Sequence, residues 1–365
     1  MKVRVNRKEL ATALSVVSGV VATRTPRPIL QCVRINVFTD HLLLTCTDLE
    51  VGLRYTIGQV ETETSGEALV SADTILNIIR ESAEDVVVLE VIDDRMHIRG
   101  EDSHFQIVES DVAEFPAVPT MEGQPHFTIS QEDFRRLSEW TLFSCAREST
   151  RYAIGGVLFD VKEQLTLVAT DGRRLSRAVG DISRVELADI PQAIVPPKAL
   201  SLLSRLAAEP EERAAVQISD NQMIMRVAQA TVSTSLVEGH FPKYEDVIPQ
   251  DCDKQVELKT VVFLSALRRA ALLTNEESKG VRLSFSEDRL VLSSRAPEQG
   301  EAEVSMSVKY RGAPLDIGFN PHFLIEALKA VQSETVLFHC STSDRPGMLE
   351  SDERFIYVIM PVSLA

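Results

Sequence analysis

The sequence repeats one pattern three times, and each copy is as long as a domain. Each copy opens with an amphipathic segment followed by strand-like runs; the openings read RKELATALSVVSGVV, SQEDFRRLSEWTLFSCA and TVVFLSALRRAALLTNEE. Thr47-Asp48 recurs as Thr170-Asp171 after 123 residues, and Phe115-Pro116 recurs as Phe241-Pro242 after 126 residues. A period of this length belongs to a whole domain rather than to a small solenoid repeat. Three similar domains in a row predict an arc that can close.

The length and two loop-like stretches give the expected domain boundaries. At roughly 100–150 residues per domain, 365 residues accommodate three domains, each with its own core. Residues 114–128 and 244–255 lack hydrophobic periodicity and are predicted linkers. We therefore predict domains at 1–124, 125–251 and 252–365.

Six segments have the periodicity of helices, two in each copy: 6–20, 71–82, 130–147, 197–207, 259–275 and 320–332. In the first helix of each copy, an apolar stripe lies opposite a polar, often basic face. The stripes are Leu10, Leu14, Val17 and Val21; Phe134, Leu137 and Thr141; and Leu264, Leu267 and Ala271. Residues typical of helix starts precede or open the second helix of each copy: Ser71, Pro197 and Asn320 or Pro321.

Alternating apolar and polar runs follow the helices, as in VVVLEVIDDRMHIRG and AAVQISDNQMIMRV. Their period of two and their polar turns predict antiparallel hairpins. Each domain should therefore hold two copies of a helix followed by several strands. The expected fold class is α+β.

The distribution of charge is more informative than its sum. The formal net charge of −16 argues by itself against nucleic-acid binding, because phosphate affinity comes from Lys and Arg. The six expected helices nevertheless contain 12 Lys and Arg against 7 Asp and Glu, so the acidic excess lies outside them. This segregation predicts two surfaces with different roles; the alternative is that the helix surfaces are simply mildly basic.

The cysteines and the N-terminal residues bear on where the protein works. The cysteines are odd in number and far apart, unlike a secreted disulfide framework: Cys32, Cys46, Cys145, Cys252 and Cys340. The opening MKVRVNRKEL has no apolar run typical of a signal peptide. No run of about 18 apolar residues occurs, so we expect no membrane contact. We expect a reducing, cytoplasmic location.

The sequence lacks the common catalytic and metal-binding motifs. It contains no GxxxxGK[ST], no GxGxxG after a strand, no HExxH and no GxSxG, and its seven His residues are scattered. Asp48 and Asp171 recur at matching places, but a Thr-Asp pair at a strand end is better explained as hydrogen-bonding its own turn. We expect no enzyme, no cofactor and no metal. Two rival classes stay open: an enzyme that uses these two aspartates, and a repeat-domain scaffold that never meets DNA.

An ordered set of short motifs covers nearly the whole chain. They are VSG (17–19), PIL (28–30), TDLE (47–50), RY (151–152), VATDGRRL (168–175), FPKY (241–244), NEESKGVRL (275–283), IGFN (317–320) and YVIMP (357–361). Together they resemble the bacterial DNA polymerase III beta subunit, the family of replication sliding clamps. VATDGRRL followed by a terminal MP is the most specific part. The resemblance implies a processivity factor without a catalytic site of its own.

The resemblance also implies an assembly. In that family two three-domain chains close head to tail into a ring, with helices lining the hole and antiparallel sheets outside. Such a ring encircles duplex DNA without reading its sequence, and weak phosphate contacts let it slide. An acidic exterior limits sticking to the DNA, which agrees with the segregated charge. The resemblance thus implies the DNA-clamp fold in three similar domains and a homodimer.

Candidate DNA-binding residues come from the resemblance and from helix position. Arg24, Tyr152 and Lys198 match DNA-contact positions of the family, whereas the others rest on helix placement. The set is Arg24, Arg80, Arg135, Arg136, Arg151, Tyr152, Lys198, Arg205, Arg268 and Arg269. Asp73 and Thr74 stand where relatives often have basic residues, so the second helix should contribute little. The alternative for each cation is a solvated surface residue.

The resemblance implies a dimer contact between the first domain of one copy and the third domain of the other. Its apolar residues are Ile78, Phe105 and Ile107 on one side and Leu272 and Leu273 on the other. Its charged residues are Arg95 and Arg99 facing Glu298, Glu301 and Glu303. The alternative is that the apolar residues are plain core.

The resemblance finally implies a pocket for short apolar peptides of the polymerase III catalytic subunit, the clamp loader, other polymerases and repair proteins. The matching positions are Ile154, Thr170, Gly172, Arg174, Leu175, Pro242, Val247, Asn320, Phe323, Val358, Met360, Pro361 and Val362. Small and aliphatic residues suit a cleft for Leu or Phe side chains; the alternative is ordinary core. The departures from the family pattern are Arg173, Asp246, Ser278 and the ending Ser363-Leu364-Ala365, so peptide preference could differ.

Overall fold

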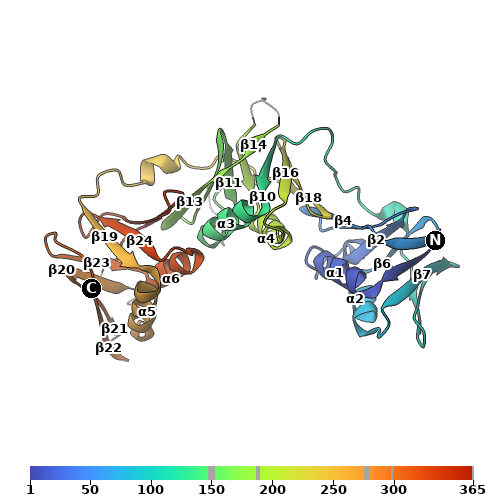
Figure 1. The fold of residues 1–365 in the computed structure, drawn as a ribbon, viewed down its shortest axis with the longest axis horizontal. Helices are drawn as coiled ribbons and strands as arrows, with labels where there is room; N and C mark the ends of the chain where they lie inside the picture. The colour runs from blue at the N-terminus through green and yellow to red at the C-terminus, as the bar shows by residue number, and fades with distance from the viewer. Residues whose placement is uncertain (147–152, 186–189, 275–279, 297–298, 364–365) are drawn as a thin grey trace. The chain divides into compact units, whose positions relative to one another are not determined.

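The computed structural model describes residues 1–146, 153–185, 190–274, 280–296 and 299–363 (Figure 1). Its Cα positions group into two compact units. Unit 1 consists of Met1–Glu132, Ser183–Pro191 and Lys198–Leu236, and unit 2 consists of Asp133–Ile182, Gln192–Pro197 and Val237–Ala365. The boundaries of the three expected domains remain a prediction.

The described residues contain six α-helices at the six predicted positions, each shorter than its predicted segment. They are α1 (Arg7–Ser18), α2 (Ala72–Glu81), α3 (Gln131–Thr141), α4 (Pro197–Leu206), α5 (Thr260–Ala270) and α6 (Pro321–Ala330). The predicted N-caps of α2 and α6 are confirmed: Ser71 Oγ accepts the N–H of Thr74 at 3.4 Å, and Asn320 Oδ1 accepts the N–H of His322 at 3.0 Å. Short 3-10 turns lie at η1 (Pro28–Gln31), η2 (Val112–Glu114), η3 (Leu142–Ser144), η4 (Tyr244–Val247) and η5 (Ala271–Leu273).

Unit 1 contains two antiparallel sheets. The first has the order β5-β1-β7-β8-β9, with β1 (Lys2–Asn6), β5 (Val60–Thr64), β7 (Val86–Ile92), β8 (Arg95–Arg99) and β9 (His104–Val108). The second has the order β14-β10-β16-β17-β18-β4-β3-β2-β6. Its strands are β2 (Cys32–Val37), β3 (Leu42–Thr47), β4 (Val51–Ile57), β6 (Gly66–Ser71), β10 (Phe127–Ser130), β14 (Ser183–Arg184), β16 (Arg213–Ile218), β17 (Gln222–Val227) and β18 (Ala230–Ser235).

Unit 2 also contains two antiparallel sheets. The larger has the order β15-β11-β12-β13-β26-β25-β24-β19, and the smaller has the order β22-β21-β20-β23. The larger is built from β11 (Val157–Val161), β12 (Gln164–Thr170), β13 (Arg174–Asp181), β15 (Ala193–Val195), β19 (Lys254–Lys259), β24 (Thr335–Cys340), β25 (Gly347–Ser351) and β26 (Phe355–Ile359). The smaller is built from β20 (Val281–Ser286), β21 (Arg289–Ala296), β22 (Gly300–Ser307) and β23 (Leu315–Phe319). The predicted antiparallel hairpins and the α+β class are confirmed.

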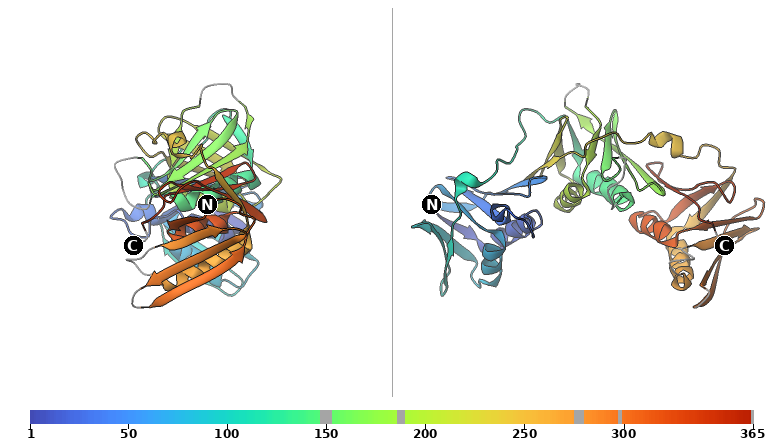
Figure 2. Two further views of the ribbon diagram at one scale, coloured as in Figure 1. Left: turned by 90° about the vertical axis from the view of Figure 1, so that its left-hand side faces the viewer. Right: turned by 180° about the vertical axis from the view of Figure 1, so that it is seen from behind.

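The helices bury one face against a neighbouring helix and the sheets. In unit 1, α1 and α2 lie side by side (Figure 2), and Leu10, Leu14, Ile75 and Ile79 are fully buried between them and the strands. The predicted stripe of α1 is confirmed, including Val21, which is 8% exposed. In unit 2, the predicted stripe of α3 is buried as well: Phe134, Leu137 and Thr141.

The predicted stripe of α5 is confirmed at Leu267 and wrong at Leu264 and Ala271, which are half-buried. The buried face consists of Phe263, Ala266, Leu267 and Ala270, whereas Leu264 is only half-buried. Both sets have helical spacing, so periodicity alone cannot choose between them. The Phe263 ring buries more apolar area than the Leu264 side chain, and its burial turns the helix toward the core.

Candidate functional site

The two Thr-Asp pairs close the same turn at two places. The first turn joins β3 to β4 in unit 1, and the second joins β12 to β13 in unit 2. Asp48 Oδ1 accepts the backbone N–H groups two and three residues later at 3.0 and 2.7 Å, and Asp171 Oδ1 does the same at 2.9 and 3.1 Å. Thr47 and Thr170 each donate their hydroxyl to the carbonyl four residues later. The interpretation of these pairs as turn-forming residues is confirmed.

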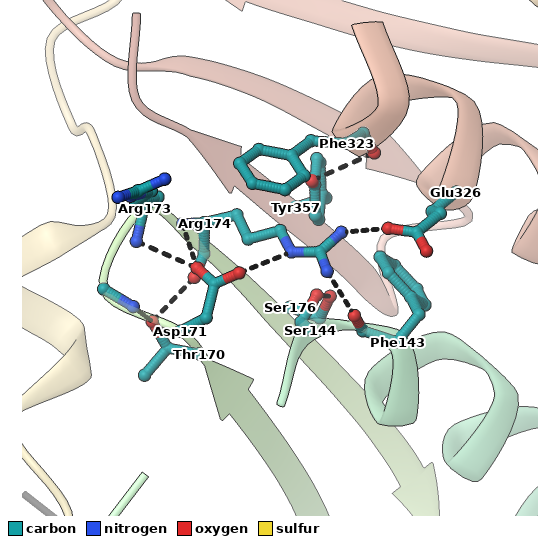
Figure 3. A network of polar contacts seen from close by, with 11 residues as sticks. Phe143, Ser144, Thr170, Asp171, Arg173, Arg174, Ser176, Phe323, Glu326 and Tyr357 are labelled. Atoms are coloured by element: carbon teal, nitrogen blue, oxygen red, sulfur yellow. Dashed lines mark hydrogen bonds and ion pairs between the residues drawn. The ribbon is translucent and has the colours of Figure 1, made fainter. Parts of the chain in front are cut away.

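The second turn leads directly into a buried arginine (Figure 3). Arg174 Nε donates to Asp171 Oδ2 at 2.9 Å, Nη1 to Glu326 Oε2 at 2.5 Å and Nη2 to the carbonyl of Phe143 at 2.5 Å. The guanidinium also lies 4.3 Å from the centre of the Phe323 ring. Only 5% of the Arg174 side chain is exposed, so its charge is balanced by protein groups rather than by water.

The surroundings of Arg174 keep it charged and keep the neighbouring tyrosine neutral. Burial alone lowers the pKa of Arg174, but the hydrogen bond to Glu326 and the nearby acidic groups raise its pKa above the ordinary value. Burial raises the pKa of Tyr357, whose hydroxyl donates to the carbonyl of Phe323 at 3.0 Å. Arg174 is therefore charged and Tyr357 neutral at neutral pH.

A hollow of about 240 Å³ lies beside this network in unit 2, and we call it the Met360 hollow. Nine of the predicted peptide-pocket residues line it: Ile154, Thr170, Gly172, Arg174, Leu175, Pro242, Val247, Val358 and Met360. Arg173 and Tyr244 line it as well. These residues come from the segment before β11, from β12, β13 and the turn between them, from the end of β26 and from the segment around η4, so the fold brings together parts of the chain that are far apart in sequence.

The wall of the Met360 hollow is apolar although it contains polar residues. Ile154, Leu175 and Val358 are buried beneath it. The polar atoms of Thr170 and Arg174 are already bonded within the turn and the arginine network. At the rim, Val247 and Met360 are 46% and 42% exposed. A site of this composition can receive an aliphatic or aromatic side chain.

Four predicted pocket residues do not line the hollow: Asn320, Phe323, Pro361 and Val362. Asn320 caps α6, and Phe323 packs on the Arg174 guanidinium. The N–H of Val362 donates to the carbonyl of Gly318 at 2.9 Å, while Pro361 is half-buried. Of the departures from the family pattern, Asp246 is exposed and Ser278 lies outside the described residues.

The candidate DNA-binding residues of the described chain lie on helix surfaces or a loop. Arg24 follows α1 in an exposed loop, and exposed side chains on the helices are Arg80, Lys198, Arg205, Arg268 and Arg269. Arg135 and Arg136 on α3 are half-buried; Arg136 pairs with Asp133 and lies 5.4 Å from the centre of the Trp140 ring. Arg80 donates to Ser15 Oγ at 3.0 Å, which joins α2 to α1. Asp73 and Thr74 are exposed on α2.

Lys198 differs from the other cations because it is bonded to the first Thr-Asp turn. Its Nζ forms an ion pair with Asp48 Oδ2 and a 3.3 Å hydrogen bond to the carbonyl of Val20. The lysine side chain is still 44% exposed, while Asp48 is 12% exposed. Lys198 therefore ties the start of α4 to the β3–β4 turn within unit 1.

The candidate dimer residues lie on two edge strands and on other elements of the same units. In unit 1, β9 is an edge strand, with Phe105 40% exposed, Val108 69% exposed and Ile107 half-buried. Ile78 on α2 is half-buried, and Arg95 and Arg99 on β8 are exposed. In unit 2, β22 is an edge strand that carries the exposed Glu301 and Glu303, with Leu272 75% exposed and Leu273 half-buried on η5. The plain-core alternative does not hold for Phe105 and Leu272.

Three predicted site residues lie outside the described part of the chain: Arg151, Tyr152 and Glu298. The sequence reasoning also missed residues that the structure places at these sites. Tyr244 lines the hollow, Phe143 and Glu326 hold Arg174, and Val108 is the most exposed apolar residue of β9. No local pattern marks Phe143 or Glu326, because each meets Arg174 only through packing.

Comparison with known proteins covers the chain from end to end. Family models described as the DNA polymerase III beta subunit N-terminal, central and C-terminal domains match residues 1–119, 128–243 and 245–363. The chain belongs to the DNA polymerase III beta subunit family. It is therefore a sliding clamp of DNA polymerase III, a processivity factor rather than an enzyme.

Relatives of the beta subunit family agree over full length. The chain is 35% identical over 370 residues to the beta sliding clamp of Escherichia coli K12 and 31% identical over 366 residues to that of Chlamydia muridarum, covering 100% and 99% of those proteins. A Pseudomonas aeruginosa sliding clamp bound to griselimycin matches with a TM-score of 0.95 at 33% identity, with both chains fully covered. These comparisons give no support to the repeat-domain scaffold. Among the described residues, no helix combines the length and apolar character that crossing a bilayer requires.

Proposed function

We propose that two copies of this chain close head to tail into a ring that encircles duplex DNA and slides along it. The ring tethers the polymerase III catalytic subunit, the clamp loader, other polymerases and repair proteins, each through a short apolar peptide. Its place of action is the cytoplasm, where the chromosome is replicated. The observation that carries the proposal is the full-length match to the beta subunit family together with an apolar hollow lined by nine of the predicted pocket residues.

The two edge strands support the head-to-tail contact. An unpaired edge can accept a strand from another copy, and β9 and β22 are both edges. The apolar side of the contact is Phe105 and Val108 against Leu272 of the partner subunit, all well exposed in a single chain. The charges are complementary, with Arg95 and Arg99 on one side and Glu301 and Glu303 on the other.

Light scattering tests the dimer. We expect twice the 40.5 kDa chain mass at micromolar concentration, and a monomer for Leu272→Asp, because an aspartate there would be desolvated without a partner. Val261→Asp is the matched control, since Val261 is 77% exposed on α5 away from the proposed contact residues. A monomeric mass for the unchanged chain contradicts the ring.

Retention on DNA tests the encirclement. We propose that the exposed cations of the helices and of the Arg24 loop make weak, sequence-independent phosphate contacts, while closure of the ring holds the protein on DNA. Loaded protein should stay on circular DNA through gel filtration and leave when the DNA is linearised. Equal retention on both forms, or none on either, rejects encirclement.

Peptide binding tests the Met360 hollow. We propose that the hollow receives the apolar side chains of a QLxLF-like peptide, with Met360 and Val247 closing over them. Met360→Ala should weaken binding by about 1–3 kcal/mol in a fluorescence-polarisation titration, because a rim side chain that covers an apolar anchor excludes water. Met121→Ala is the control, since that methionine does not line the hollow. Unchanged affinity for Met360→Ala removes Met360 from the peptide site.

A further inference from the structure

A second hollow lies in unit 1, between the β2–β3–β4 face and the segment after η2. Its volume is about 160 Å³, and we call it the Arg54 hollow. The strands contribute Arg34, Thr45 and Arg54, and the segment contributes Phe115, Pro116 and Val118. Nothing in the family match or in the proposed function uses these residues.

The internal repeat provides a counterpart for this hollow within the same molecule. Arg34, Thr45 and Arg54 are neighbours across three strands, with Thr45 three residues before Asp48 and Arg54 six residues after it. In unit 2, Leu158, Val168 and Arg177 are neighbours across three strands in the same way. Val168 lies three residues before Asp171, and Arg177 lies six residues after it. The two sets of three therefore occupy equivalent positions.

The segments that cover the two faces are also equivalent. Phe115-Pro116 corresponds to Phe241-Pro242, and the residue two positions further on is Val118 in unit 1 and Tyr244 in unit 2. Tyr244 is only 7% exposed and packs in one cluster with Leu158 and Val168. Its ring thus fills, in unit 2, the space above the strands that stays open in unit 1.

Charged side chains act on the Tyr244 hydroxyl. Burial raises the pKa of Tyr244, the carboxylates of Glu245 and Asp160 raise it further, and the Arg177 guanidinium lowers it. Arg177 is therefore close enough to the phenol to act on it electrostatically. Its counterpart Arg54 lines the open hollow.

The side chain of Val118 does not fill the hollow because it packs elsewhere. A Cβ placed on Gly52 would lie 2.6 Å from Val118 Cγ1, so Val118 sits directly against the Gly52 backbone. The counterpart of Gly52, four residues after the aspartate, is the buried Leu175. Because Gly52 has no side chain, Val118 can pack against its backbone. The space above Thr45 and Arg54 is then left unfilled.

The volume and the walls of the Arg54 hollow suit one aromatic ring with an oxygen. A cavity of about 150 Å³ holds a benzene molecule. Phe38, which is 42% exposed, and Phe115 supply aromatic walls. Arg34 is neutralised by Glu67 at 2.6 Å, whereas the Arg54 guanidinium makes no hydrogen bond or ion pair with the described part of the chain.

The carboxylate of Asp160 near Tyr244 has no equivalent on β2 in the Arg54 hollow. Asp160 pairs with Thr166 across β11 and β12, and the matching pair across β2 and β3 is Asn36 and Leu43. The carboxylate is thus replaced by an amide, whose nitrogen donates to Glu67 at 3.0 Å. The carboxylate of Glu67 on β6 is held by Arg34 and Asn36, so an oxygen acceptor that enters beside Arg54 meets a guanidinium with no other partner among the described residues.

We propose that the Arg54 hollow binds a tyrosine side chain presented by a partner protein, with the ring over Thr45 and the phenol oxygen accepting a hydrogen bond from Arg54. The ring takes the place that Tyr244 holds in unit 2. Phenylalanine binds more weakly at the same place because it leaves Arg54 without an acceptor. The proposal is independent of DNA encirclement and of the Met360 hollow.

Methyl NMR of the full-length protein tests the site, with p-cresol as the side-chain analogue of tyrosine. The methyl signals of Leu43 and Val118 should shift and saturate, with a Kd in roughly the millimolar range for so small a ligand. Toluene should bind at least about three-fold more weakly. In Arg54→Met, the Kd for p-cresol should rise about ten-fold while that for toluene stays unchanged. Arg226→Met, at an exposed arginine of β17 that lines neither hollow, is the matched control and should leave both unchanged.

Two variants fill the hollow from opposite sides. Val118→Tyr copies unit 2, and Thr45→Phe fills the hollow from the strand; each should abolish the p-cresol shifts at Leu43. If one variant fails to fold, the other carries the test. Methyl signals of Leu175 and Val358 report binding at the Met360 hollow, and p-cresol shifts confined to them overturn the proposal.

N-acetyltyrosinamide distinguishes a peptide-borne tyrosine from a free phenol. It should shift the Leu43 methyl signals more strongly than N-acetylphenylalaninamide does. Binding of p-cresol without binding of N-acetyltyrosinamide overturns the assignment to a partner protein. Equal affinities of p-cresol for the unchanged chain and for Arg54→Met overturn the role of Arg54.

Discussion

The Thr-Asp turn of unit 1 and that of unit 2 share a backbone but not their surroundings. In both, the threonine and aspartate side chains satisfy the same backbone groups, and the residue after the aspartate has a left-handed conformation. That residue is Leu49 in unit 1, with φ 81°, and Gly172 in unit 2, with φ 86°. The repeat therefore reproduces the turn even where a leucine replaces the residue that the conformation favours.

The difference lies in the residue three positions after the aspartate. In unit 1 this is Val51, which is fully buried, and Asp48 turns its second oxygen to the exposed Lys198. In unit 2 it is Arg174, which pairs with Asp171 and with the distant Glu326. The residue at this position is thus an apolar core side chain in unit 1 and the centre of a buried ion-pair network in unit 2.

The largest effect is expected for Arg174→Ala. Removing the guanidinium leaves the largely buried Asp171 and the partly exposed Glu326 without their partner and empties a buried space beneath Phe323, so the variant should lose about 3 kcal/mol of stability. Urea unfolding followed by Trp140 fluorescence measures this, because Trp140 is the single tryptophan and is buried in unit 2. Arg173→Ala, next to it and exposed, should change stability by less than about 0.5 kcal/mol. Equal losses of stability for the two variants would show that the buried network contributes no more than an exposed arginine.

The next effect concerns pH. Burial raises the pKa of the Cys145 thiol, which lies near Arg174 and Asp171, from its ordinary value to about 12. Below both pKa values the thiol is neutral in either state and stability does not depend on it. As pH rises past about 8.5, the unfolded state loses the proton first and is favoured, at about 1.4 kcal/mol per pH unit.

The Cys145→Ala variant measures how much of the stability lost at alkaline pH is due to this thiol. Between pH 8 and pH 10, the unfolding free energy of the variant should fall by about 2 kcal/mol less than that of the unchanged chain. Urea titrations at several pH values, with the Trp140 signal, provide the comparison. Parallel pH profiles for the two proteins would show that the thiol ionises equally in both states.

Exchange of the left-handed residues tests whether the two turns are equally strained. Gly172→Ala meets open space at its Cβ, so only the backbone conformation opposes it, and the cost should be about 1 kcal/mol. Leu49→Gly relieves a similar strain but loosens the unfolded chain, so its net effect should lie within about 0.5 kcal/mol of zero. Calorimetry on both variants decides the point. A loss above about 1 kcal/mol for Leu49→Gly would mean that the half-exposed leucine makes a needed contact.

The smallest effect is expected for Lys198→Met. The lysine is 44% exposed, so loss of its ion pair with Asp48 should cost less than about 1 kcal/mol and should shrink in high salt. Calorimetry at low and high salt tests this, with Lys243→Met, an exposed lysine of the η4 segment, as the control. A loss of stability above about 2 kcal/mol that does not change with salt would show that this ion pair stabilises the fold as a buried pair does, like the Arg174 network.

The sequence by itself determined the features whose partners are close along the chain. The Thr-Asp turns bond only groups within four residues, so a dipeptide is enough to predict them. The caps Ser71 and Asn320 depend on the next helical turn, and the helices lie where periodicity places them. The same local patterns recur in each copy of the repeat. Together with the ordered motifs, they also identified the family.

The tertiary structure alone decided the contacts between distant residues. Arg174 meets Glu326 across 152 positions, and Lys198 meets Asp48 across 150, so no local pattern announces either pair. The choice of Phe263 over Leu264 on α5 also depended on the surface against which the helix packs. The hollow beside Arg54 exists because Val118 packs on Gly52. This contact depends on how the covering segment packs on the assembled sheet, so it cannot be read from either segment alone.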